Sequence, residues 1–169
     1  MRQSISFALL LFFNITYATE SPNNILCKVD ETTLFNCNLA KKTASLCLKK
    51  RTNQIEYRMG TDAKKEFTFP KTLKNSIEQF KLSTTPYSGG GENRIRFSNG
   101  IYNYFIYDIT KTQKYISGDD SLQIAGIAIY AKNKFIANLK CSNSGASITS
   151  PAFEILQREN FSQEVDTYR

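Results

Sequence analysis

Short segments rich in β-branched and aromatic residues recur along the chain, each bounded by turn-forming residues. Segments of this kind are typical of β-strands. Eight strands are expected, at residues 33–39, 44–49, 54–59, 66–69, 94–97, 101–109, 122–130 and 134–141. The pattern predicts an all-β, mainly antiparallel domain, either a small barrel or a sandwich. Helix is scarce, and short helices are expected only at residues 73–80 and 151–158.

Asn99-Gly100 is the clearest turn signal in the chain. Both residues tolerate the positive φ angles of a type I′ turn, so the pair predicts a tight hairpin between its two flanking strands. With these two residues as the turn, the expected cross-strand pairs are Phe97 with Tyr102 and Ile95 with Tyr104. A second hairpin is expected around residues 130–134.

The N-terminus predicts export. Arg2 precedes an apolar stretch at residues 5–13, and Thr16 and Ala18 provide the small residues that a signal peptidase requires. The apolar stretch is much shorter than the roughly 20 residues of a membrane span. We expect a periplasmic or secreted protein that does not span the membrane. The expected parts are a signal peptide at residues 1–18, a single β domain at residues 19–158 and a frayed tail at residues 159–169.

Four cysteines follow the expected cleavage site. An even number in an exported domain favours two disulfides, and the chain lacks the CxxC spacing typical of a zinc site. Three pairings are open. Cys37 and Cys141 each point with the apolar side chains of their strands, whereas Cys47 points opposite to those of its own strand. This alternation favours Cys37–Cys141 with Cys27–Cys47.

Positive charge is concentrated in one stretch of the chain. Residues 39–81 hold eleven Lys and Arg against four acids, an excess of seven that equals the net charge of the whole chain, +7. The stretch is interpreted either as a solvated basic face or as a surface that attracts an anionic envelope component. Export and the lack of a nucleic-acid-binding motif argue against a nucleic-acid partner. The residues expected on this surface are Lys41, Lys42, Lys49, Lys50, Arg51, Lys64 and Lys65.

The run Ser88-Gly89-Gly90-Gly91 is the most unusual local feature. Consecutive glycines cost backbone entropy on folding, so an ordered run is typical of positive φ angles, a bulge or a close backbone approach. One interpretation is therefore a structural connector or edge bulge. The other is a binding loop that presents backbone amides, together with the side chains of Ser88 and Glu92, to a partner.

Catalysis finds little support in the sequence. The chain has no histidine, which excludes Ser-His-Asp and Cys-His catalysis and His-ligated metals. Ser88 has no activating neighbour, and Asp119-Asp120 is typical of a solvated turn. Glu56, Glu92 and Asp108 are the carboxylates considered for a catalytic pair. We expect no catalytic residue, no metal and no cofactor, and therefore a protein that acts by binding and not as an enzyme.

Several motifs, kept in order and spacing, resemble those of a group of small exported β proteins of Gram-negative bacteria. They lie at residues 34–37 (LFNC), 45–47 (SLC), 55–60 (IEYRMG), 88–91 (SGGG), 94–97 (RIRF), 102–104 (YNY) and 136–141 (IANLKC). More distantly, the chain is similar to periplasmic lysozyme inhibitors, which are disulfide-containing antiparallel β proteins that insert a loop into the lysozyme cleft. Their loop motif begins with Ser-Gly, which Ser88 and Gly89 match. The resemblance implies a protein partner, with lysozyme as its most concrete form, and binding of an envelope polyanion through residues 39–81 is the alternative.

Overall fold

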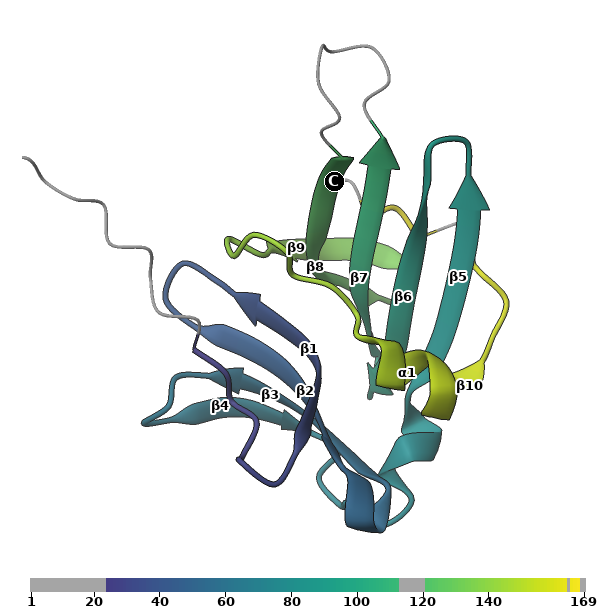
Figure 1. The fold of residues 1–169 in the computed structure, drawn as a ribbon. Coiled ribbons are helices and arrows are strands. Elements are labelled where there is room, and N and C mark those ends of the chain that lie inside the picture. The colour runs from purple at the N-terminus through teal and green to yellow at the C-terminus, as the bar shows by residue number, and fades with distance from the viewer. Residues whose placement is uncertain (1–23, 113–120, 164, 168–169) are drawn as a thin grey trace, which may run out of the picture.

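The computed structural model describes residues 24–112, 121–163 and 165–167. Its strands form two sheets, of four and six strands, that face each other as in a sandwich (Figure 1). This confirms the expected mainly antiparallel β fold, and neither sheet closes into a barrel. The expected signal peptide at residues 1–18 and the pair Asp119-Asp120 lie outside the described residues.

The first sheet is an antiparallel meander, in which each strand pairs with the next one along the chain. Its strands are β1 (Thr32–Asn38), β2 (Thr43–Lys49), β3 (Gln54–Gly60) and β4 (Lys65–Phe69). A 3-10 helix, η1 (Lys50–Thr52), lies between β2 and β3. All four strands overlap the segments predicted from the sequence.

The second sheet has the strand order β10–β5–β6–β7–β8–β9. Its strands are β5 (Lys81–Tyr87), β6 (Gly90–Asn99), β7 (Tyr102–Thr112), β8 (Ser121–Ala131), β9 (Lys134–Lys140) and β10 (Gln157–Arg158). The short β10 runs parallel to β5, and the other pairings are antiparallel. The sequence does not predict β5, because this strand carries Ser83, two threonines and Pro86 and buries only one apolar residue, Leu82.

The helices are shorter than expected. The segment predicted at residues 73–80 forms the 3-10 helix η2 (Ser76–Gln79). The segment predicted at residues 151–158 forms α1 (Ser150–Ile155), with Pro151 in its first turn, and then enters β10. Within the described ranges, no helix has the length and apolar character needed to cross a bilayer.

The main core lies between the two sheets and is rich in aromatic side chains. The ring of Phe97 in β6 lies 4.7 Å, centroid to centroid, from Tyr104 in β7 and from Phe69 in β4. Tyr57 in β3 approaches the same ring at 5.0 Å. Burial of one such side chain contributes about 1.5–3 kcal/mol to the free energy of folding. Because these rings come from both sheets, their packing holds the sheets together.

The hairpin between β6 and β7 differs in register from the prediction. Phe97 pairs with Tyr104 and Ile95 with Ile106, not with Tyr102 and Tyr104. The turn is therefore Gly100-Ile101 instead of Asn99-Gly100. Gly100 has a φ of 61°, and a positive φ at the first central position is typical of a type II′ turn, which requires glycine there. Since the register shifts by two residues, the same side chains still face the core.

The second predicted hairpin is confirmed. Lys132 and Asn133 connect β8 to β9, and both have positive φ angles, 47° and 64°. Ala131 pairs with Lys134 on either side of them. Two successive positive φ values are typical of a type I′ turn.

Both disulfides follow the pairing that the sequence favours. Cys27–Cys47 joins the N-terminal described residues to β2. Cys37–Cys141 joins β1 of the first sheet to the residue that follows β9 of the second sheet. The second bond therefore links the two sheets covalently.

The N-terminal residues 24–31 cover the outer face of the first sheet. Arg58 of β3 is buried and donates hydrogen bonds to the Leu26 carbonyl at 3.0 Å and to the Glu31 carboxylate at 2.8 Å. The Leu26 amide in turn donates to the Ser45 hydroxyl at 3.1 Å. These contacts and the Cys27–Cys47 bond fix the segment on the sheet.

The outer face of the second sheet is covered by the residues that follow β10, 159–163 and 165–167, which we call the C-terminal strap (Figure 1). Arg94 of β6 donates to the carbonyls of Ser162 and Val165, both at 2.8 Å. The Tyr130 hydroxyl donates to the Asp166 carbonyl at 2.9 Å. Of the frayed tail expected at residues 159–169, the structure describes residues 159–163 and 165–167, and side chains of the sheet bind carbonyl groups of this described part.

Candidate functional site

Ser88 and Gly89 form the tip of the hairpin between β5 and β6. Tyr87 pairs with Gly90, so Ser88 and Gly89 are the two turn residues, and both are exposed. Gly89 has a φ of 79°, which favours glycine. The Thr112 amide donates to the Gly89 carbonyl at 2.6 Å and ties the tip to the end of β7. The tip is therefore both accessible and held in place at the rim of the sheet (Figure 1).

Gly90 and Gly91 belong to β6 and not to the turn. A Cβ atom on Gly90 would lie 1.8 Å from the Thr110 carbonyl oxygen of β7. A Cβ atom on Gly91 would lie 3.3 Å from the Thr85 carbonyl oxygen of β5. These two glycines thus allow the neighbouring strands to approach closely, which is the structural role considered for the run.

Glu92 is buried between the outer face of β6 and the C-terminal strap. Only 4% of its surface is exposed. Its carboxylate accepts hydrogen bonds from Arg94 and from the Thr167 hydroxyl of the strap, both at 2.6 Å. Of the residues expected in the binding loop, the structure therefore leaves Ser88 and Gly89 accessible at the tip and encloses Glu92.

The seven expected basic residues are exposed, but they lie at two opposite ends of the first sheet. Residues 41–42 and 64–65 belong to the β1–β2 and β3–β4 connections or their flanks, which an antiparallel meander places at one end. Residues 49–51 lie at the other end. Lys42 pairs with Glu66, and the Lys49 ammonium lies 4.0 Å from the Asp30 carboxylate. The seven residues therefore do not form one continuous patch.

The three carboxylates considered for catalysis lie apart. Glu56 belongs to the first sheet, whereas Glu92 and Asp108 point to opposite faces of the second sheet. Asp108 accepts hydrogen bonds from Asn93 at 2.7 Å and from the Ile148 amide at 2.6 Å. Burial raises the pKa of the Asp108 carboxyl. Asp108 faces the space between the sheets. Its hydrogen bond with the Ile148 amide therefore fixes the connection between β9 and α1.

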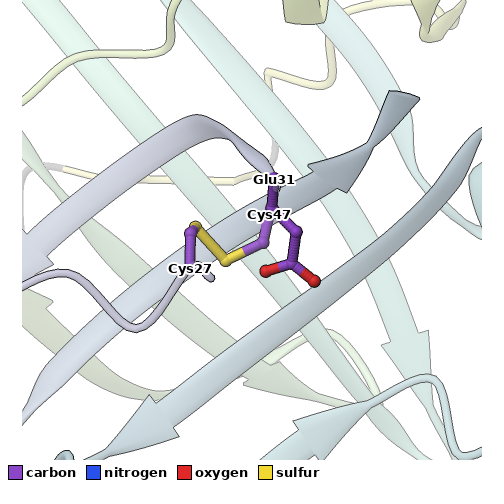
Figure 2. Close-up of side chains that lie close together, drawn as sticks. All are labelled: Cys27, Glu31 and Cys47. Atoms are coloured by element: carbon purple, nitrogen blue, oxygen red, sulfur yellow. A yellow bond between two sulfur atoms is a disulfide. The ribbon is translucent and has the colours of Figure 1, made fainter. Parts of the chain in front are cut away.

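Two sulfur atoms and a carboxylate gather beside β2. Figure 2 shows Cys27, Cys47 and Glu31 close together. The two sulfurs are joined in a disulfide and cannot act as thiolate ligands. The Glu31 carboxylate binds Arg58. The cluster is therefore a structural cross-link beside an ion pair and does not fit a metal.

A cavity of about 300 Å³ lies between the C-terminal strap and the outer face of the second sheet. Arg94, Arg96, Phe105 and Tyr130 of the sheet line it, and Glu159 lines it from the strap. In the predicted strand at residues 94–97, the alternation of side chains places Arg94 and Arg96 on the face opposite the core. The sequence offers no signal that a distant segment covers that face, so the cavity was not predicted.

The geometry defines a disulfide-linked, two-sheet antiparallel β domain with an exposed hairpin tip and a covered outer face. No family model, curated protein or solved structure matches the chain.

Proposed function

We propose that the chain is an exported binding protein, periplasmic or secreted, that binds another protein through the β5–β6 hairpin tip and catalyses no reaction. The observation that carries this proposal is the accessible, hydrogen-bonded turn at Ser88 and Gly89. A lysozyme is the most concrete partner, because these two residues match the start of the inhibitor loop motif.

The hairpin tip has properties that a cleft-binding loop needs. Such a loop gains affinity when little conformational freedom is lost on binding. A two-residue turn has few free torsions, and the Thr112 amide restrains it further. The Tyr87 hydroxyl donates to the Gly91 carbonyl at 3.1 Å beside the turn. The small side chain of Ser88 and the lack of a side chain at Gly89 let the backbone come close to a partner.

Export and the absence of catalysis are supported by other features. All four cysteines are in disulfides, which persist in oxidising compartments such as the periplasm and the extracellular space. The three candidate carboxylates occupy separate places, so they do not provide an acid and a base on one substrate.

Binding of an envelope polyanion is supported less well. Affinity for a polyanion grows with the number of cations that contact it together. Here the expected basic residues are divided between two ends of a sheet, and Lys42 and Lys49 have acidic neighbours. This division favours the hairpin tip over the basic residues as the binding element.

The test measures cell-wall lysis by lysozymes of several structural classes in the presence of the mature protein. We expect inhibition of at least one class. Ser88→Tyr should weaken inhibition about tenfold or more and leave the melting temperature unchanged, because the residue is exposed at the tip. The matched control is Asn99→Tyr, which introduces the same side chain at the exposed opposite end of β6 and should inhibit like the parent. Inhibition that survives Ser88→Tyr would remove the tip as the binding element, and failure to inhibit any class would remove lysozyme as the partner.

A further inference from the structure

The cavity beneath the C-terminal strap is a concave site, separate from the exposed hairpin tip. Its volume, about 300 Å³, is at the lower end of the range usual for small-molecule sites, which makes it too small for a protein segment of several residues. The sheet forms its floor and the strap its opposite wall. Glu159 of the strap is fixed there by a two-point ion pair with Arg96.

The floor of the cavity combines polar and aromatic side chains from three neighbouring strands. Arg96 pairs with Phe105 across β6 and β7, and Asn103 pairs with Tyr130 across β7 and β8. Paired residues point to the same face, so these four side chains lie side by side. The rings of Phe105 and Tyr130 meet edge to face, with centroids 5.8 Å apart. Only 8% of Phe105 and 6% of Tyr130 is exposed, so a ligand on this floor would meet a small area of ring surface next to hydrogen-bonding groups.

The floor carries no net charge. Arg94 pairs with Glu92 at 2.6 Å. Arg96 binds both carboxylate oxygens of Glu159, with Nε at 2.9 Å from Oε1 and a terminal nitrogen at 2.6 Å from Oε2. Each guanidinium is thus neutralised by a carboxylate, and an anionic ligand would have to displace one of them. The site therefore favours a neutral, polar ligand over an anion.

The rim adds groups that both donate and accept hydrogen bonds. Asn133 comes from the β8–β9 turn, and Asn160 and Ser162 come from the strap. Side-chain amides and hydroxyls can each donate and accept, which is what the hydroxyl groups of a ligand require. The small exposed area of the Phe105 and Tyr130 rings suits contact with a few C–H groups of a sugar ring. We propose that this cavity binds a neutral carbohydrate of one or two sugar rings, as a site additional to the protein-binding tip.

The test is an NMR titration of the isotopically labelled mature protein with glucose, galactose, mannose, N-acetylglucosamine and the β-1,4-linked dimer of N-acetylglucosamine. Glucose 6-phosphate and glucuronate serve as anionic comparisons. We expect at least one neutral sugar to bind saturably, with a Kd of about 1 mM or lower, and to shift the signals of Asn133 and Tyr130. No saturation by any neutral sugar at about 50 mM, or tighter binding of the anionic analogues, would overturn the proposal.

Matched variants distinguish sugar binding in the cavity from sugar binding elsewhere on the surface. Asn133 has a φ of 64°, so Asn133→Gly removes its amide and keeps the turn geometry. Combined with Asn160→Ala, it should weaken sugar binding about tenfold. The control is Asn53→Gly, the same change at a φ of 49° in the first sheet, which should leave binding unchanged. Equal affinity of the double variant and the parent would overturn the proposal. Ser88→Tyr should bind sugar with the same affinity as the parent. A failure of the sugar-binding proposal can therefore be distinguished from a failure of the hairpin-tip proposal.

Discussion

Arg94 lies against the ring of Phe161, with its guanidinium carbon 3.9 Å from the ring centroid. The same guanidinium donates to the carbonyls of Ser162 and Val165 and pairs with Glu92. Cation–π contact, charge-assisted hydrogen bonds and a buried ion pair thus converge on one residue. Arg94 is therefore a principal anchor of the C-terminal strap.

We expect Arg94→Ala to lower the free energy of unfolding by about 3–5 kcal/mol, because it leaves the Glu92 carboxylate buried without its cation. Urea denaturation measures this change. Amide exchange in residues 159–163 should also become faster, since the strap loses the two hydrogen bonds that Arg94 donates to its carbonyls. The control is Arg51→Ala, an exposed change that should stay within about 0.5 kcal/mol. A loss below about 1 kcal/mol with unchanged exchange would contradict the anchoring role.

Gly90→Ala should destabilise the protein more than Gly100→Ala. A Cβ atom at Gly90 meets the Thr110 carbonyl oxygen at 1.8 Å, so a backbone strand must move. At Gly100 no atom of the described residues lies within 4 Å of the added atom, and the cost is the positive φ of the type II′ turn alone, about 1–3 kcal/mol. Thermal unfolding of the two variants shows which substitution lowers the melting temperature more. The reverse order would show that the close approach of β6 and β7 is not needed for stability.

Glu31 should make stability depend on acid pH. The hydrogen bond from Arg58 lowers the pKa of the Glu31 carboxyl below its ordinary value of 4.5. The unfolded chain then binds a proton more readily than the folded one, so the ion pair stabilises the fold above pH 4.5 and is lost as pH falls through the folded-state pKa. The free energy of unfolding should decrease between about pH 6 and about pH 3, and this decrease should be smaller for Glu31→Gln than for the parent. Denaturation at the two pH values measures it. Glu78→Gln, at an exposed site, should keep the parent's dependence, and an equal decrease in all three proteins would refute the role of Glu31.

Removal of the two disulfides should have unequal effects. Cys37–Cys141 joins residues 104 apart in the sequence, and Cys27–Cys47 joins residues 20 apart. A longer closed loop restricts the unfolded chain more, so the paired alanine substitutions should cost about 4–5 kcal/mol for the first bond and about 3 kcal/mol for the second. Urea denaturation of both double variants measures the difference. Equal losses would mean that loop length does not determine the contribution of these bonds.

The parts of the fold that were predicted depend on local patterns. Strand alternation indicates most of the long strands and the faces of Cys37 and Cys141. The short connection between the segments at residues 122–130 and 134–141 indicates the β8–β9 hairpin. The turn beside Gly100 was misplaced because Asn99 also tolerates a positive φ, and the sequence does not show which residue adopts it. The strand β5 was missed because its Ser- and Thr-rich sequence lacks an alternating apolar pattern.

The candidate sites depend more than the fold does on contacts between residues that are distant in the sequence. The sequence singles out Ser88 and Gly89, but it does not show that Gly90 and Gly91 serve strand packing. It gives no indication of the cavity, because Arg96 and Glu159 are 63 residues apart and their pairing has no periodic signal. Side chains of the sheet also bind backbone carbonyl groups of the strap, and every residue type has such a carbonyl. The polar composition of the strap therefore suggests a frayed tail, although the structure has an anchored segment there.

The most direct test of binding through the hairpin tip is site-specific photocrosslinking in cells that export the protein. A photoreactive amino acid replaces Ser88 in one sample and Asn99, at the opposite end of β6, in the other. We predict a discrete adduct with one protein partner at position 88 and none at position 99. No adduct at position 88, or the same adducts at both positions, would contradict binding through the tip.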